Sequence, residues 1–68
     1  MLMLIHMVNY YEETEITFDN ARIITVKSGK ELNEHGLRLK STHNYYVVTT
    51  NITNYYFDTK YWFVSLKQ

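Results

Sequence analysis

The stretch from Tyr45 to Leu66, YYVVTTNITNYYFDTKYWFVSL, decides the fold because β-branched and aromatic residues fill most of it. Two polar triplets interrupt it, Asn51-Ile52-Thr53 and Asp58-Thr59-Lys60, and both have the composition of turns. Apolar runs between turn residues are typical of β-strands. The stretch predicts three antiparallel strands of a meander, near residues 45–50, 54–58 and 61–66.

Both faces of this predicted sheet carry apolar side chains. Successive side chains of a strand point to opposite faces, so with three-residue loops one face holds Val48, Tyr56, Trp62, Val64 and Leu66. The opposite face holds the six residues that we predict to bind a partner: Tyr45, Val47, Tyr55, Phe57, Tyr61 and Phe63. A sheet that is apolar on both sides must be covered on both. Either a partner covers the second face, or the sheet closes into a barrel and hides it.

The residues before this stretch keep a period of two. Residues 15–19 alternate polar and apolar side chains, residues 22–27 are rich in β-branched side chains, and Asp19-Asn20-Ala21 between them has turn chemistry. This pattern predicts a hairpin. At the N-terminus, residues 1–8 are apolar but far fewer than the ~20 that a membrane-spanning helix needs. They predict a buried strand and no membrane association.

Residues 30–35 are the only segment with helical propensity, and Gly29 and Gly36 bracket it. The segment is too short for a stable isolated helix and predicts a single helical turn. Residues 37–42 alternate again and predict a strand, with Leu37 and Leu39 facing the core. A two-residue turn at His43-Asn44 would lead from that strand into the next one.

These patterns predict one domain, residues 1–68, of the all-β, mostly antiparallel class. We expect a small five- to six-stranded meander or barrel with at most one short helical turn between residues 29 and 36. The chain is 46% hydrophobic and has no net charge, so it is too apolar to be disordered. Its 68 residues include no cysteine, so aromatic packing or self-association must support the small core in place of disulfides. The absence of cysteine also favours a reducing compartment, the cytoplasm.

Charge is distributed unevenly along the chain. Residues 1–19 contain four acids and no base, whereas residues 20–68 contain seven bases and three acids, so the two parts carry −4 and +4. This asymmetry allows the acidic segment of one copy to approach the basic part of another. The triplet Asn-Tyr-Tyr occurs three times, beginning at residues 9, 44 and 54. Its uneven spacing excludes a repeat architecture.

The sequence lacks the combinations of residues that form catalytic or metal sites. His6, His35 and His43 lie far apart and no cysteine accompanies them, so we expect no metal and no cofactor. Ser41 lies two residues from His43, but a turn brings such neighbours together without any catalytic role. We therefore predict that the protein is not an enzyme, since a substrate pocket is difficult to form in so small a core.

Nucleic-acid binding is the alternative to protein binding. Small β-barrels of the OB, SH3 and Sm types can bind single strands by stacking bases on exposed aromatic rings within a basic groove. The residues that would form such a surface here are Arg38, Lys40, Tyr45 and Tyr55. Zero net charge argues against this alternative, because proteins that neutralise many phosphates are basic.

The sequence therefore favours a small non-catalytic protein-binding module that regulates or inhibits another protein through an aromatic sheet face. The partner is another protein, a second copy of the chain in a homo-oligomer, or both. In its shortness and its abundance of Asn, Tyr and Lys, the chain resembles small accessory proteins of phages and other mobile elements. That resemblance implies a host enzyme or nucleic-acid machine as the target.

Overall fold

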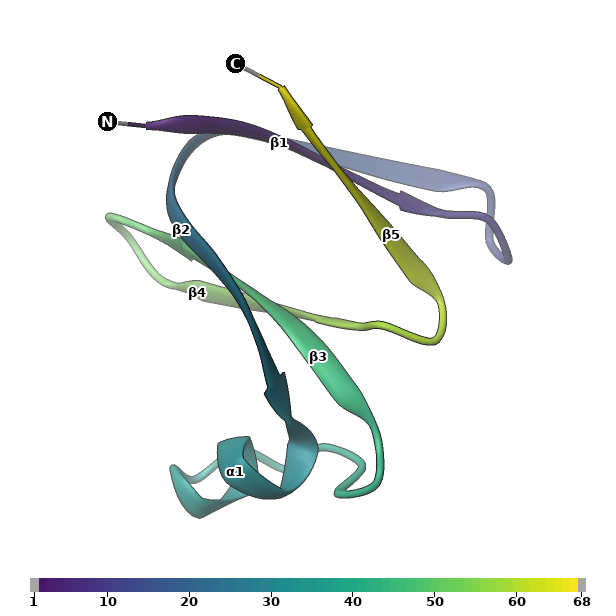
Figure 1. The fold of residues 1–68 in the computed structure, drawn as a ribbon, viewed down its shortest axis with the longest axis vertical. Helices are drawn as coiled ribbons and strands as arrows, with labels where there is room; N and C mark the ends of the chain where they lie inside the picture. Colours follow the sequence, from purple (N-terminus) through teal and green to yellow (C-terminus); the bar gives the residue numbers. More distant parts are fainter. Residues whose placement is uncertain (1, 68) are drawn as a thin grey trace.

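The structure of the chain, a computed structural model, describes residues 2–67 and the side chains as far as Ser65. It contains one five-stranded antiparallel sheet and one short helix (Figure 1). The elements are β1 (Met3–Asn9), β2 (Thr14–Ser28), α1 (Gly29–Glu34), β3 (Asn44–Thr50), β4 (Asn54–Asp58) and β5 (Trp62–Lys67). The all-β, mostly antiparallel class is confirmed, as is the short helical turn after Ser28.

The strand order in the sheet is β4-β3-β2-β1-β5, and every neighbouring pair is antiparallel. The first four strands form a meander, whereas β5 crosses to the far edge and pairs with β1. The prediction that β5 follows β4 in the meander is therefore wrong. Only residues 59–61 separate β4 from β5, so the sheet curls until its two edges approach each other at that turn (Figure 1). Over residues 2–67 the sheet stays open and is not closed into a barrel.

β2 is one continuous strand of 15 residues, so the predicted hairpin with a turn at Asp19-Asn20-Ala21 is wrong. The first part of β2 pairs with β1 and the second part with β3, and Ala21 pairs with both Met3 and Thr50. The register shifts on both sides of this crossing point. Residues with turn chemistry also suit such irregularities, which bend a strand without reversing the chain. The triplet therefore bends β2 instead of ending it.

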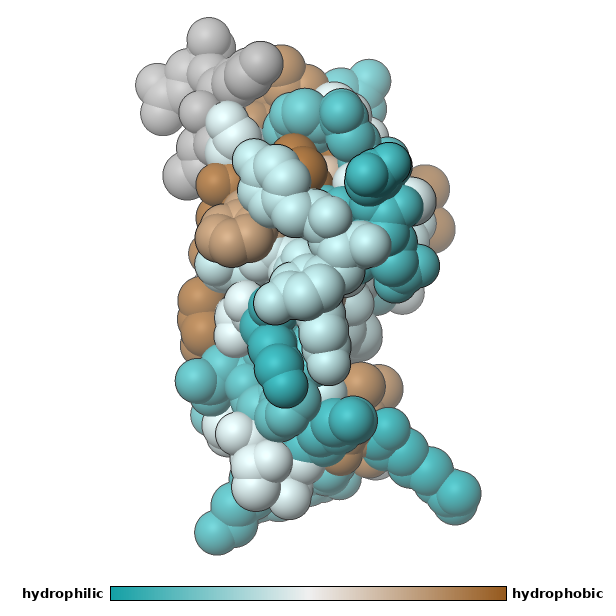
Figure 2. Space-filling view, turned by 90° about the vertical axis from the view of Figure 1, so that its right-hand side faces the viewer, coloured by the Kyte–Doolittle hydropathy of each residue, from teal (hydrophilic) through white to brown (hydrophobic). Residues whose placement is uncertain are grey.

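The inner face of the curled sheet carries the main core. Its buried members are Ile5, Met7, Phe18, Ala21, Val48 and Phe57. Trp62 and Val64 of β5 pack against them from positions opposite Asn9 and Met7 of β1. Pairing with β1 thus brings both β5 side chains onto the core. The Cα atoms span 31 × 28 × 15 Å, a thin disc that Figure 2 shows along its edge.

β4 is shifted by one residue from the predicted register. Val48 pairs with Tyr55 instead of Tyr56, because Thr50 closes a four-residue turn with both its backbone N–H and its hydroxyl. A shift of one residue moves every side chain of a strand to the opposite face. Tyr55 and Phe57 therefore face the main core and Tyr56 faces outward, the reverse of the prediction.

A second apolar cluster lies on the outer face of β3 and β4, beneath α1. It consists of Leu32, Tyr45 and Val47, with Leu37, Leu39 and Tyr56 packed against them. The predicted strand over residues 37–42 is wrong, because β2 and β4 already occupy both sides of β3 and the segment crosses the outer face as irregular chain. Its two leucines were predicted to face the inner side of the sheet, but they pack on the second cluster at its outer face. The side chain of Asn33 holds the segment by donating to the carbonyl of Leu39 at 2.9 Å and accepting from its N–H at 2.7 Å.

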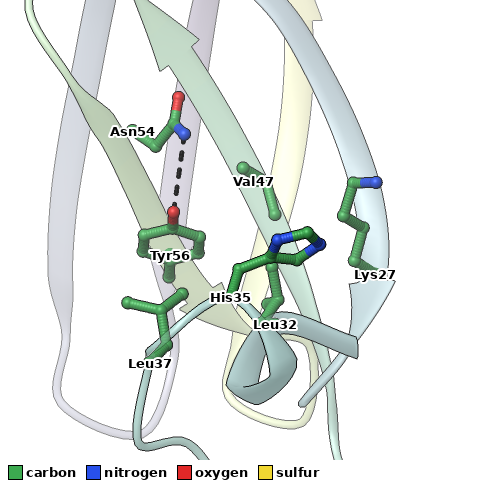
Figure 3. Close-up of a pocket in the computed structure, with 7 residues that line it drawn as sticks. All are labelled: Lys27, Leu32, His35, Leu37, Val47, Asn54 and Tyr56. Atoms are coloured by element: carbon green, nitrogen blue, oxygen red, sulfur yellow. Dashed lines mark hydrogen bonds between the residues drawn. The ribbon is translucent and has the colours of Figure 1, made fainter. Parts of the chain in front are cut away.

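A pocket of about 270 Å³ opens beside α1 at this second cluster. Its wall is formed by apolar side chains and by one tyrosine: Leu32, Leu37, Val47 and Tyr56. Lys27, His35 and Asn54 supply polar groups around it, with Lys27 on the β2 side and Asn54 on the β4 side (Figure 3).

We expect Ala21→Leu to lower the free energy of unfolding by about 1–3 kcal/mol, because added methylene groups overpack a fully buried position where three strands meet. Urea unfolding followed by the fluorescence of Trp62 measures this change. Arg22→Ala, at the exposed neighbouring position, is the control and should stay within about 0.5 kcal/mol of the wild type. Equal stability of the two variants would show that the crossing point is not closely packed.

Candidate functional site: an exposed aromatic patch

Four aromatic residues gather where the β1–β2 turn meets the chain around the start of β5. We call them the aromatic patch: Tyr10, Tyr11, Tyr61 and Phe63. Tyr10 packs edge-to-face on Phe63 with 5.1 Å between ring centroids, and Tyr11 packs on Tyr61 in the same way at 5.2 Å. Such pairs stabilise a structure beyond the area that they bury. Tyr10, Tyr11 and Phe63 are nevertheless 67%, 70% and 54% exposed, so the patch presents its rings to solvent.

The surroundings of the patch combine both signs of charge. Lys60 Nζ lies 5.6 Å from the ring centroid of Tyr61, within the range of a cation–π contact. Glu12 and Glu13 follow directly in the β1–β2 turn and are exposed. Figure 2 looks onto the side of the molecule where both turns lie, and surface of intermediate hydropathy (pale) fills the middle of that side between hydrophobic (brown) and hydrophilic (teal) groups.

The side chain of Asn9 orders the β1–β2 turn. Asn9 is buried, and its Oδ1 accepts from the N–H groups of Tyr11 at 2.9 Å and Glu12 at 3.0 Å. The first of these bonds closes an Asx turn, and the second adds to it. Glu13 has a positive φ of 55°, which few residues other than glycine adopt, and it completes the reversal toward β2. Tyr10 and Tyr11 are therefore held on an ordered turn.

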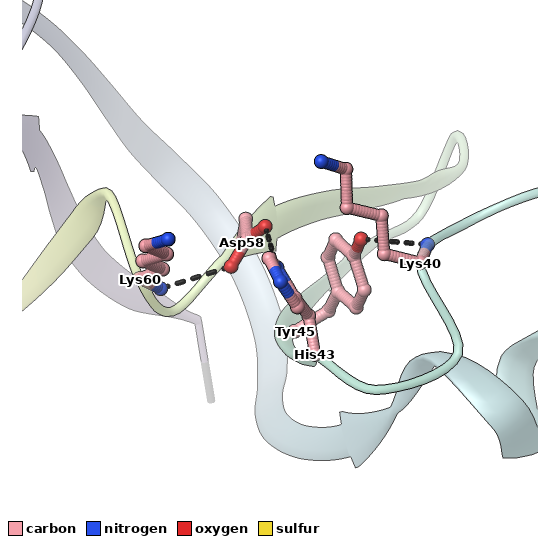
Figure 4. Close-up of polar contacts among 5 residues, drawn as sticks. All are labelled: Lys40, His43, Tyr45, Asp58 and Lys60. Atoms are coloured by element: carbon pink, nitrogen blue, oxygen red, sulfur yellow. Dashed lines mark hydrogen bonds and ion pairs between the residues drawn. The ribbon is translucent and has the colours of Figure 1, made fainter.

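Asp58 has the same role in the β4–β5 turn (Figure 4). Its Oδ1 accepts from the N–H of Lys60 at 2.9 Å, its Oδ2 accepts from His43 Nδ1 at 2.7 Å, and its backbone carbonyl accepts from the N–H of Tyr61 at 3.1 Å. Asp58 thus fixes the backbone that carries Tyr61, and its bond to His43 ties this turn to the segment that follows α1.

The environment of Asp58 keeps it ionised. Burial would raise the pKa of this carboxyl, but the hydrogen bonds from His43 and from the backbone of Lys60, together with the charges of His43 and Lys40, lower the pKa below its ordinary value. Because an ionised carboxylate can only accept, the proton in the contact lies on His43 Nδ1. Beside this pair, the Tyr45 hydroxyl accepts from the N–H of Lys40 at 3.0 Å (Figure 4).

The structure separates the six residues predicted to bind a partner. Tyr61 and Phe63 lie in the aromatic patch. Three others are buried: Tyr45, Val47 and Phe57. Tyr55 lies on the inner face, where its ring packs on Phe18 with centroids 4.9 Å apart. The prediction that all six share one face is therefore wrong, and the shifted register of β4 together with the cover provided by α1 accounts for it.

The four residues of the alternative nucleic-acid surface are also separated. Arg38 and Lys40 are exposed on the irregular segment that crosses the outer face. Tyr45 lies beneath this segment and is buried, whereas Tyr55 lies on the inner face of the sheet. Neither tyrosine ring of this set therefore lies exposed beside the two basic residues.

Tyr10 and Tyr11, which make up half of the patch, were not among the residues predicted to bind a partner. A signal was present, because Asn9 precedes them in the first Asn-Tyr-Tyr triplet and asparagine is typical of turns that its own side chain closes. The second and third triplets instead begin β3 and β4, where successive tyrosines alternate between faces. The triplet therefore indicates a turn only where it follows the end of a strand.

Neither a protein-family profile, nor a curated protein, nor a solved structure matches this chain. Among residues 2–67, no three His, Asp or Glu side chains are grouped so that they could hold a metal ion. No helix in the same part of the chain is long and apolar enough to cross a membrane. The aromatic patch is therefore the feature of the molecule from which a function can be inferred.

We expect Asp58 to contribute to the loss of stability in acid. Its pKa is lower in the folded state than the ordinary value of 3.8, so its ionised form stabilises the fold above that value, and the contribution is lost as the pH falls through the folded pKa. In Asp58→Asn, the free energy of unfolding in urea should therefore fall less than in the wild type from about pH 5 to about pH 2. Glu34→Gln, at an exposed position, is the control and should behave like the wild type. Equal losses of stability in all three proteins would show that Asp58 does not contribute to the acid sensitivity.

Proposed function

We propose that this protein is a small non-catalytic binding module that regulates or inhibits another protein by binding it through the aromatic patch. One observation carries the proposal: two ordered turns hold four aromatic rings in edge-to-face pairs, and three of these rings are more than half exposed. Soluble monomers rarely group large apolar side chains on their surface unless a partner covers them.

The construction of the patch suits protein recognition. Tyrosine and phenylalanine provide a large contact area with few rotatable bonds, so their immobilisation costs little conformational entropy. Asn9 and Asp58 already order the backbone of the two turns, which lowers the cost of binding further. Lys60 lies over the ring of Tyr61 and two exposed acids follow Tyr11 in the β1–β2 turn, and polar groups beside apolar ones are common at protein interfaces.

The charges near the patch favour a protein over a nucleic acid. Glu12 and Glu13 would repel phosphate groups, and Lys60 is the base that contacts the patch. The whole chain has no net charge, whereas proteins that bind nucleic acids through several phosphates are basic. The absence of cysteine fits a partner in a reducing compartment such as the cytoplasm.

We expect Tyr11→Ala and Phe63→Ala each to weaken binding to the partner by about 2 kcal/mol while the fold is kept, because exposed aromatic residues often dominate interface energies. The partner is first identified by affinity capture from the native host, and the affinities of the purified proteins are then measured by calorimetry. Circular dichroism and thermal unfolding check the fold of each variant.

Ile52→Ala is the matched control, because Ile52 is an exposed apolar residue on the β3–β4 turn, at 78% exposure, and lies away from the patch (Figure 1). This variant should bind like the wild type. The proposal is wrong if the patch variants keep full affinity, or if the captured material is nuclease-sensitive and binding depends steeply on salt.

A further inference from the structure

The pocket beside α1 suits a protruding side chain better than a cofactor. Its volume of about 270 Å³ lies below the roughly 300–1,000 Å³ of pockets that enclose drug-sized ligands. Leu32, Leu37 and Val47 line it with apolar groups, and Lys27 and His35 stand at its rim (Figure 3). An occupant that carries an apolar or aromatic side chain next to an acidic group would match both parts of this site.

The β1–β2 turn of the same chain has these properties. Tyr10 and Tyr11 are the most exposed rings of the aromatic patch, and Glu12 and Glu13 follow them. The first 19 residues carry four acids and no base, whereas the residues that line the pocket include Lys27 and His35 and no acid. The turn and the pocket are therefore complementary in charge as well as in hydrophobicity.

The turn cannot reach the pocket of its own chain, because the β1–β2 turn and α1 lie at opposite ends of the curled sheet (Figure 1). We propose that the β1–β2 turn of one copy inserts into the pocket beside α1 of a second copy. This inference rests on the proposed function, since Tyr10 and Tyr11 belong to the aromatic patch, and it names a second copy of the chain as one partner of that patch.

Such a contact joins two different surfaces, so each added copy uses one of them and still offers the other. The copies therefore add head to tail, into a ring or an open chain. Lys27 forms an ion pair with Glu31 at 2.9 Å, but both side chains are exposed and such pairs contribute little, so Lys27 can exchange its partner. We expect the mass of the assembly to rise with concentration and to fall with added salt.

A charge swap tests this contact by sedimentation equilibrium. The turn variant carries Glu12→Lys with Glu13→Lys, and the pocket variant carries Lys27→Glu with His35→Glu. Each alone should raise the concentration needed for assembly at least about tenfold, because like charges then face each other. A chain with all four substitutions should assemble again, as should an equimolar mixture of the two variants. Circular dichroism establishes that each variant folds.

Cross-linking gives a second measurement that does not depend on the swapped charges. The chain contains no cysteine, so Glu13→Cys and His35→Cys each introduce a single thiol. A short bismaleimide should join an equimolar mixture of these two variants far more efficiently than either variant alone. Glu13→Cys mixed with Ser65→Cys, at another exposed position, is the matched control.

Three results would overturn the inference: a wild-type protein that stays monomeric at all concentrations, assembly that is insensitive to both charge swaps, or cross-linking no greater than in the control mixture. The proposed function is tested separately, by the binding of a partner protein. The pocket variant leaves all four residues of the aromatic patch intact, so its binding to an unrelated partner protein should persist even where self-association is lost.

Discussion

The bend of β2 at Ala21 is the constraint on which the rest of the structure depends. Without a shared strand, β1 with β5 and β3 with β4 would be two separate two-stranded sheets, and such small sheets are barely stable in water. Because β2 pairs with both β1 and β3, its bend folds one two-stranded unit over the other and brings the end of β4 near the start of β5. The residue at the crossing is the small Ala21, which pairs with Met3 and Thr50 and is fully buried.

The two turns that carry the aromatic patch are ordered in the same way. Each turn is ordered by one short polar side chain, Asn9 or Asp58, that accepts backbone N–H groups which would otherwise lack partners in the sheet. Asn9 is buried beneath its turn and Asp58 is held by His43. The positions of Tyr11 and Tyr61 therefore follow from buried and partly buried polar contacts, so the fold itself orders the aromatic patch.

The period of two was sufficient to predict the all-β class, because the alternation of side chains is a local property of a strand. Strand pairing is not local, and the errors follow from that difference. Residues 19–21 suit a turn and a bend equally well, and a single turn at Thr50 reverses both faces of β4. Tyr61 and Phe63 were predicted from their own segment. Their ring partners at positions 10 and 11 depend on the pairing of β1 with β5, which no local pattern indicated.

The outer face of the sheet explains why the patch lies where it does. Over β3 and β4, α1 and the segment after it cover the apolar side chains. Gly29 allows α1 and this segment to approach closely, since a Cβ at this position would overlap the carbonyl oxygen of Lys40. Over β1 and β5, the part of the chain that the structure describes supplies no such cover. Because alternation along β5 places Trp62 and Val64 on the core, it necessarily turns Phe63 to this uncovered side. The pattern that builds the core therefore also exposes the ring around which the patch forms.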